Sequence, residues 1–300
     1  MLRIAYSPIY KYELPEGHRF PMAKYELIAE QLLYEGSVSE ANFFHPDPLD
    51  ESVALLTHSQ EYWDKLNQVK LSAKEVRAIG FPINEKFVWR GRHIAQGTIQ
   101  CARFALETGI AMNVAGGTHH AFRDHGEGYC CFNDQAVAAN YLLQQGLAQR
   151  ILIVDLDVHQ GNGTAAIFRD EPRVFTFSMH GERNYPLRKE TSSLDLGLPD
   201  GMEDAPYLQL LRTTLPRLAD TFQPDFVFYL SGVDVLATDK LGRLALTRAG
   251  CRERDRFVLD FCRNQGLPMV VCMGGGYSHR MADIVEAHAN TFRVANELYF

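Results

Sequence analysis

The sequence predicts an α/β fold with a mostly parallel central sheet that is flanked by helices on both faces. Short apolar runs rich in Ile, Val and Phe alternate with longer helical patterns along the whole chain. This alternation is typical of a doubly wound sheet. No internal repeat, low-complexity stretch or Pro/Gly/Ser-rich linker divides the 300 residues, so we expect one domain over residues 1–300.

The expected elements follow from these patterns. The apolar runs predict strands at Leu2–Tyr6, Ala111–Ala115, Ile151–Asp155, Val174–Ser178, Phe226–Leu230 and Met269–Met273. The helical patterns cover Met22–Tyr34, Glu85–Glu107, Asp134–Gln145, Asp204–Phe222, Thr247–Gln265 and Ser278–Leu298. Gly146 and Gly266 stand where helix C-terminal glycines belong, and Thr247 is an expected N-cap. Leu66–Ile83 and Gly181–Gly201 show no regular pattern. Because the second follows a strand, it either lines a site at that edge of the sheet or is a surface excursion.

Composition excludes several classes of protein. Hydrophobic residues make up 46% and charged residues 22% of the chain, as in ordinary globular proteins. A net charge of −7 argues against a nucleic-acid-binding face. It is compatible with a cationic ligand, although a mild negative charge also simply keeps proteins soluble. With no signal-peptide region and no apolar run of membrane-spanning length, we expect a cytoplasmic protein with no membrane partner. The six cysteines form no Cys-x-x-Cys pair, which favours free thiols.

The stretch Ile151–Thr164 carries the clearest chemical signal. Four apolar residues lead directly into Asp155, Asp157 and His159. Alternation along a strand places these three side chains on one face, at the carboxyl end of a buried strand. Unpaired buried charge is costly, and a divalent cation is a common way to remove that cost. The alternative is that the two carboxylates cap a turn or helix while the imidazole binds a carbonyl.

Three further stretches also follow predicted strands. They contain the adjacent His119 and His120 after Gly116 and Gly117, Asp234 within Ser231–Leu236, and Tyr277 after three glycines. Taken singly, each stretch has an ordinary explanation. Adjacent histidines are usually a surface feature, and Asp234 could cap a helix or turn. The three glycines could form a tight crossover or a phosphate cradle, although no phosphate-loop motif is present.

Together the stretches supply a full set of catalytic groups. Asp157, His159 and Asp234 could give a metal three ligands with open positions left. The paired histidines could transfer protons, with Asp155 and Asn162 as outer partners. Tyr277 could donate to a developing oxyanion.

In this order and spacing, the motifs resemble those of the histone deacetylase superfamily. That superfamily includes zinc-dependent histone deacetylases, acetoin-utilisation proteins and acetylpolyamine amidohydrolases. Gly128–Asp134 and Asp239–Gly242 match as well, so the resemblance spans nearly the whole chain. It implies the arginase–deacetylase fold and a zinc-dependent deacetylase that hydrolyses an N-acyl amide, with an acylated amine or acyl-lysine as substrate.

The resemblance also implies roles for individual residues. One Zn²⁺ would be held by Asp157, His159 and Asp234. His120 resembles the main general base and acid, and His119 its electrostatic partner. Asp155 would orient His119, Asn162 would orient His120, and Tyr277 resembles the residue that polarises the carbonyl. The substrate channel would be lined by Gly128, Tyr129, Gly275 and Gly276. A monovalent cation, K⁺ or Na⁺, would be bound by Asp155, Asp157, His159, Ser178 and Met179.

Some positions depart from the best-known members. Gln160 and Asn162 stand where class I deacetylases have His and Asp, which is similar to class IV deacetylases and their bacterial relatives. A neutral Asn lowers the expected pKa of His120. Lys24 falls in a region where a basic residue can line an acetate-release passage, but we expect it at the surface. The acidic loop of polyamine-selective members is not evident. Three alternatives stay open: an acetylpolyamine or other small-amide hydrolase, a binuclear arginase-like hydrolase, and a catalytically silent binding module.

Overall fold

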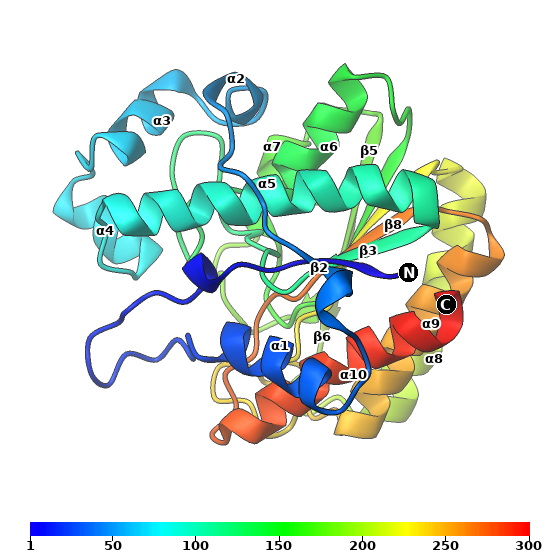
Figure 1. The fold of residues 1–300 in the computed structure, drawn as a ribbon. Helices are drawn as coiled ribbons and strands as arrows, with labels where there is room; N and C mark the ends of the chain where they lie inside the picture. The colour runs from blue at the N-terminus through cyan, green and yellow to red at the C-terminus, as the bar shows by residue number, and fades with distance from the viewer.

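A parallel sheet of eight strands runs through the computed structural model, which describes residues 1–300 (Figure 1). The strands lie in the order β2-β1-β3-β8-β7-β4-β5-β6, and every neighbouring pair is parallel. Their bounds are β1 Arg3–Ala5, β2 Phe43–Phe44, β3 Ile110–Asn113, β4 Ile151–Asp155, β5 Val174–Gly181, β6 Leu194–Leu198, β7 Phe226–Leu230 and β8 Met269–Cys272. The predicted fold class is therefore confirmed.

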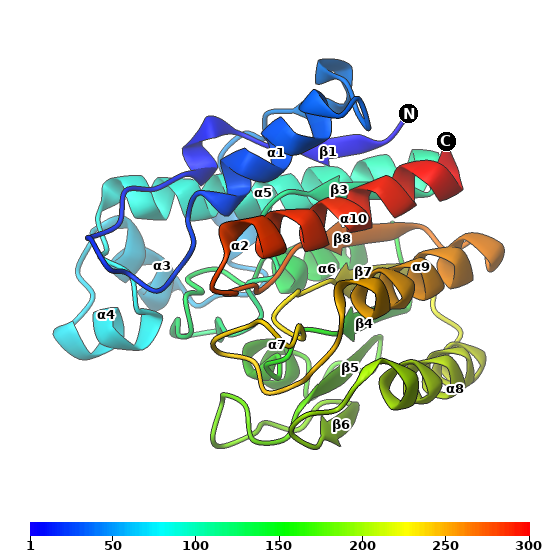
Figure 2. The same cartoon turned by 90° about the horizontal axis from the view of Figure 1, so that it is seen from below.

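Helices cover both faces of this sheet. α5 and α6 pack on one face, and α1, α10, α9 and α8 form a row on the other (Figures 1 and 2). The α-helices are α1 Lys24–Tyr34, α2 Glu51–Ala54, α3 Gln60–Asn67, α4 Ala73–Ile79, α5 Glu85–Thr108, α6 Asp134–Gln144, α7 Asn162–Ile167, α8 Asp204–Phe222, α9 Arg248–Asn264 and α10 Met281–Tyr299. Two 3₁₀ helices span Pro8–Tyr10 and Glu40–Asn42. None of the helices is long and apolar enough to cross a membrane.

Local signals mark the start of α9 and the ends of α6 and α9 where the sequence predicts them. The Thr247 side chain accepts a hydrogen bond from the backbone N–H of Gly250 at the start of α9. Gly146 and Gly266, each with φ of +66°, follow α6 and α9 in the left-handed conformation that glycine adopts without strain.

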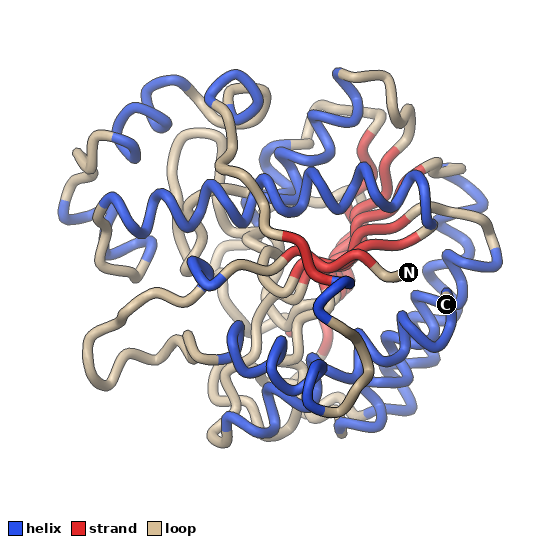
Figure 3. The backbone as a smooth tube through the Cα atoms, viewed as in Figure 1, coloured by secondary structure: helices blue, strands red, loops and turns tan.

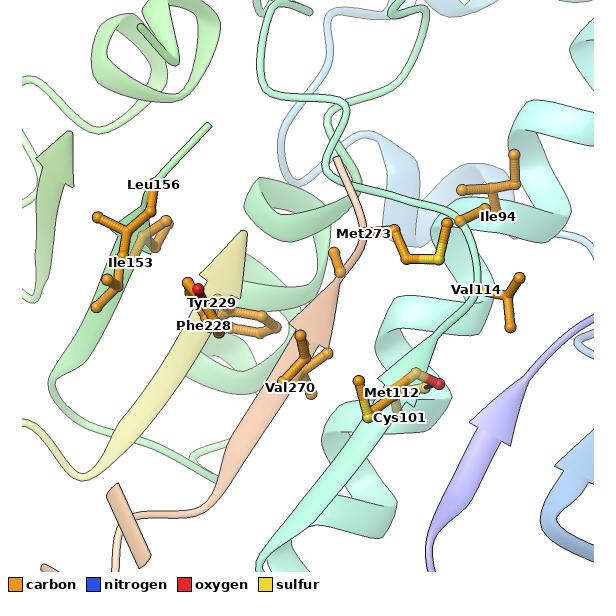
Figure 4. Packing of buried hydrophobic residues seen from close by; sticks show 14 of the residues in the cluster. Ile94, Cys101, Met112, Val114, Ile153, Leu156, Phe228, Tyr229, Val270 and Met273 are labelled. Carbon is orange, nitrogen blue, oxygen red and sulfur yellow. Dashed lines mark hydrogen bonds between the residues drawn. The ribbon is translucent and has the colours of Figure 1, made fainter. Parts of the chain in front are cut away.

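The core packs on the strands and on the helices that cover them. Figure 3 shows this arrangement of strands and helices in the backbone. Ile153, Phe228 and Val270 are register partners on β4, β7 and β8, and all are buried (Figure 4). Because both faces of the sheet are covered, these strands are apolar on both sides, as in other parallel sheets. Each such side chain stabilises the fold by about 1.5–3 kcal/mol relative to exposure.

Both segments that we expected to be irregular contain regular structure. Residues 66–83 include α4, which begins with a capping box between Ser72 and Glu75. Residues 181–201 include the edge strand β6, whose pattern is obscured by Asp195 and Gly197 on a half-exposed edge. The two-residue strand β2 was also missed, because a run that short has no periodicity to detect.

The topology brings the candidate stretches together. They follow β3, β4, β7 and β8, which lie side by side in the sheet order β3-β8-β7-β4. Parallel strands end at the same edge, so the four loops converge at the carboxyl end of the sheet. Both chain termini lie at the opposite end (Figures 1 and 2).

Candidate active site

Asp157, His159 and Asp234 converge at the carboxyl edge of the sheet. One ligand atom from each lies within 4.8 Å of the others, and the residues are 1%, 8% and 0% exposed. His159 Nδ1 lies 3.0 Å from Asp157 Oδ1 and 3.2 Å from Asp234 Oδ2. Two carboxylates and an imidazole at these distances form a donor set that suits Zn²⁺ and leaves positions open for other ligands.

The environment of these groups favours a positive charge between them. Asp234 Oδ1 accepts from the Val158 N–H at 3.0 Å, but Asp234 Oδ2 is buried and accepts no hydrogen bond. Burial alone would lower the pKa of His159, yet the two carboxylates raise this pKa to about 10. Burial and the charge of Asp157 raise the pKa of Asp234 to about 7. An orphaned carboxylate oxygen this deep is expensive unless a cation neutralises it, so the residues fit a metal.

Glycine is required where the loops press against these carboxylates. The Gly275 N–H donates to Asp157 Oδ2 at 2.7 Å, and a Cβ on Gly275 would lie 1.9 Å from Asp234 Oδ2. A Cβ on Gly232 would similarly lie 2.2 Å from Asp157 Oδ2. The glycine-rich loop after β8 is thus part of the wall of the candidate metal site.

A buried arginine holds the loops that carry the acidic ligands. The Arg254 guanidinium on α9 donates to the carbonyl oxygens of Leu156, Ser231 and Gly232 at 3.1, 3.3 and 2.7 Å. Its charge is balanced by Asp255 at 2.8 Å. Sequence reasoning missed Arg254, because its position in the helical pattern of α9 does not distinguish it from surface arginines.

The two adjacent histidines lie beside the metal ligands with separate partners. His119 Nδ1 hydrogen-bonds to Asp155 Oδ2, and His120 Nδ1 to Asn162 Oδ1, each at 2.7 Å. Their ring centroids are 4.1 Å apart. Burial opposes a charged His119, but Asp155 overrides it and raises the pKa. Burial and the nearby His119 and His159 lower the pKa of His120. The pair therefore contains one imidazole that favours charge and one that favours neutrality.

Asn162 connects His120 to a carboxylate that sequence reasoning missed. The Asn162 Nδ2 amide donates to Glu127 Oε1 at 2.5 Å. Burial and a hydrogen bond to the same Glu127 raise the pKa of Tyr185. An Asp at position 162 would place a carboxylate directly against the His120 imidazole. In this protein the carboxylate belongs to Glu127 instead, and it contacts His120 only through Asn162.

Tyr277 lies on the opposite wall and is 7% exposed. Its backbone N–H donates to Asp239 Oδ2 at 2.6 Å, and its ring centroid is 6.4 Å from that of His159. Burial, Asp234 and Asp157 raise the pKa of Tyr277 well above 10, so the phenol keeps its proton. Asp239 belongs to the stretch Asp239–Gly242, which matches the superfamily but carries no predicted role.

Two cavities that share lining residues such as His120 and Tyr277 lie beside these groups. The inner one has a volume of about 40 Å³ and is lined by His119, His120, Asp157, His159, Tyr277, Gly128, Tyr129 and Gly275, among others. The outer one has about 440 Å³, within the range of small-molecule sites. Tyr129 and Tyr185 lie on its walls, so the beginning of the Gly181–Gly201 segment does line the site. Gly276 lines neither cavity, because it packs against Val233, Ile284 and His288.

Lys24 is not at the surface, so that expectation was wrong. It is 0% exposed, and its Nζ donates to the Gly274 carbonyl at 2.9 Å and lies 5.7 Å from the centroid of the Tyr277 ring. Burial lowers its pKa to about 8. The fold turns this face of α1 toward the glycine loop.

Two of the residues assigned to a monovalent cation, Asp155 and Ser178, lie on neighbouring strands. Ser178 is the register partner of Asp155 on the neighbouring strand β5, and its hydroxyl hydrogen-bonds to His180 Nδ1 at 2.9 Å. Met179 is buried in the core. All six cysteines are free and buried, as expected.

The sequence is similar to those of known deacetylase-family proteins. The family model of the histone deacetylase domain matches residues 18–292. An uncharacterized protein of Picosynechococcus sp. is 46% identical, with 99% of each chain covered. Histone deacetylase 2 of Arabidopsis thaliana is 30% identical over 89% of this chain and 72% of its own. The acetoin utilization protein AcuC of Bacillus subtilis is 28% identical over 91% and 76%.

Solved structures show the same fold. The HD domain of HDA15 superimposes with a TM-score of 0.82 at 23% identity, covering 98% of this chain and 90% of its own. An HDAC homolog complexed with SAHA gives a TM-score of 0.85 at 24% identity, with 99% and 84% covered. On the extent of the domain match and the identity to the Arabidopsis protein, the chain belongs to the histone deacetylase family.

Proposed function

We propose that this protein is a zinc-dependent deacylase that hydrolyses the amide of an acylated amine, with acyl-lysine as the best-fitting substrate. The observation that carries the proposal is the Asp157–His159–Asp234 cluster, within 4.8 Å, in which Asp157 and His159 line the same cavity as His119, His120 and Tyr277. Family membership supports an amide hydrolase. Zinc, the acyl-lysine substrate and the residue roles are our inference.

Asp157, His159 and Asp234 would hold the ion. When bound, Zn²⁺ supplies a water of lowered pKa and polarises the substrate carbonyl. The neighbouring residues of the monovalent site, Asp155 and Ser178 among them, would bind K⁺ or Na⁺. The bound cation would offset the negative charge of the acidic cluster.

His120 would accept the proton from the attacking water and return it to the leaving amine. Its Nδ1 proton is engaged by Asn162, so Nε2 is the free nitrogen that can exchange a proton. The lowered pKa of His120 keeps it neutral and ready to accept. Proton transfer of this kind contributes about 10²–10⁴ in rate.

The remaining groups would stabilise the negative charge that develops on the substrate or hold His120 in position. His119, whose pKa is raised by Asp155 despite burial, would place positive charge beside the developing negative charge. The protonated phenol of Tyr277 would donate to the oxyanion, a contribution worth about 10²–10³. Glu127 is a positioning residue that acts on His120 through Asn162.

Hydrolysis of an acetyl-lysine peptide by the purified, zinc-reconstituted protein tests this proposal. We expect turnover that a hydroxamate chelator inhibits and that returns when zinc is restored. A protein that binds zinc but hydrolyses neither acyl-lysine peptides nor small acylated amines would contradict it and favour a binding module.

A further inference from the structure

Three arginines surround the mouth of the outer cavity. They come from separate elements: Arg77 from α4, Arg183 from the segment after β5, and Arg243 from the segment before α9. We refer to these three residues as the arginine rim. Among all 14 residues that line this cavity, none is Asp or Glu.

The rim keeps a positive charge after its ion pairs are counted. Arg183 and Arg243 share a single carboxylate, Asp200, at 3.8 and 3.1 Å. Their side chains stay 76% and 56% exposed. Arg77 is exposed and belongs to no ion pair. The rim therefore has three guanidinium groups and one carboxylate partner, on a protein whose overall charge is −7.

Two further carboxylates close to the cavity wall, Glu127 and Asp239, are engaged by partners of their own. Glu127 is engaged by the Asn162 amide and the Tyr185 hydroxyl in the channel wall, and it does not line the cavity. Asp239 is held by the backbone N–H groups of Leu241, Gly242 and Tyr277. Neither carboxylate is placed to receive an ammonium group from a bound substrate.

This arrangement discriminates between the possible carriers of the acyl group. A substrate whose acylated amine reaches Tyr277 and His120 must leave its remainder at the mouth, against the rim. The free ammonium groups of an acylated polyamine would meet guanidinium groups there and be repelled. Carboxylates would be attracted, and guanidinium forks bind carboxylates with two parallel hydrogen bonds.

We infer that the substrate is an acyl-lysine flanked by acidic residues, Asp or Glu, whose carboxylates bind the arginine rim. This inference rests on the proposed function and adds the chemistry of the carrier to it. It places acylated polyamines among the poor substrates, although they share the scissile amide.

Matched substrates test the inference. Three acetyl-lysine peptides of one length carry Asp, Asn or Lys on both sides of the acetyl-lysine, and N-acetylputrescine is the fourth substrate. We expect kcat/KM to be about tenfold higher for the Asp peptide than for the Asn peptide, on the scale of two exposed ion pairs. The Lys peptide and N-acetylputrescine should fall below the Asn peptide. The preference should shrink to about twofold or less in about 0.5 M salt, where exposed charges are screened.

Arginine variants test whether the rim causes the preference for the Asp peptide. Arg77→Gln, Arg183→Gln and Arg243→Gln combined should bring the Asp-to-Asn ratio of kcat/KM close to one. The matched control is Arg103→Gln on α5, an exposed arginine near the opposite end of the sheet, which should leave the ratio unchanged. Equal turnover of the Asp, Asn and Lys peptides would overturn the inference and leave the deacylase intact. A preference that survives the loss of all three arginines would overturn it as well. No turnover of any of the four substrates would instead count against the proposed function.

Discussion

Asn162 donates its amide to Glu127 at 2.5 Å while its carbonyl accepts from the Nδ1–H of His120. The amide thus has a fixed orientation, with its oxygen toward the imidazole and its nitrogen toward the carboxylate. The carboxylate and the amide can exchange places. An Asp at position 162 would still accept from His120, and a Gln at position 127 would donate its amide N–H to that Asp.

Exchanging these two groups tests whether Glu127 acts on His120. Asn162→Asp alone places two carboxylates at hydrogen-bond distance, so we expect kcat to fall about tenfold or more, the scale of coupling between contacting groups. Glu127→Gln alone should cost about twofold, because its amide oxygen can still accept. The double variant should recover most of kcat at an unchanged KM. If Glu127→Gln does not improve the Asn162→Asp protein, the two residues are not coupled.

Removing the phenol hydroxyl tests the role of Tyr277. Tyr277→Phe keeps the ring that packs against Phe20 and Tyr129 but removes the donor to the oxyanion. We expect kcat to fall about 10²–10³-fold with zinc content and thermal stability unchanged. Metal analysis and steady-state kinetics measure this, and wild-type kcat would remove Tyr277 from the mechanism.

Replacing one acidic ligand tests the metal site. Asp234→Asn preserves shape and the acceptor for the Val158 N–H but removes the charge on the orphaned Oδ2. We expect zinc affinity to fall at least about 10-fold, since even outer-shell substitutions cost that much. The matched control is Asp220→Asn, an exposed carboxylate on α8. Full zinc retention by Asp234→Asn, measured by competition with a chromogenic chelator, would contradict the ligand assignment.

A buried histidine away from the site predicts how stability depends on pH. His58 donates from Nδ1 to the Phe122 carbonyl and accepts at Nε2 from the Asn133 N–H, and burial lowers its pKa to about 4. The folded state therefore excludes a proton that the unfolded chain takes up near pH 6.5. Its stabilising contribution is complete above about pH 6.5 and declines toward about pH 4, by up to about 3 kcal/mol.

Urea unfolding at several pH values measures this contribution. His58→Gln, which offers one donor and one acceptor but does not titrate, should flatten the decline between about pH 6.5 and 4. His45→Gln is the control at an exposed position. An unchanged pH profile for His58→Gln would show that His58 is not the titrating group.

The sequence alone predicts much of the fold and of the candidate site. Central strands such as Ile151–Asp155 are continuous apolar runs because helices cover both faces. Asp157, Asp234 and Tyr277 each follow such a run, so a parallel sheet brings them to one edge. The edge strand β6 was missed, because its burial is partial and its pattern is interrupted by polar residues and glycine.

Residues whose roles depend on long-range packing could not be read in this way. Lys24 and Arg254 are ordinary helix residues in the sequence, and only the packing of α1 and α9 against the glycine loop and the strand ends buries them. Glu127 and the arginine rim belong to segments without a shared motif. Their proximity is a property of the folded chain.

Anomalous diffraction at the zinc edge from crystals of the zinc-loaded protein tests the central claim most directly. We predict one peak, bounded by Asp157, His159 and Asp234 and next to the cavity that His120 and Tyr277 line. A peak elsewhere, or two peaks within one site as in a binuclear hydrolase, would contradict the proposed mononuclear deacylase.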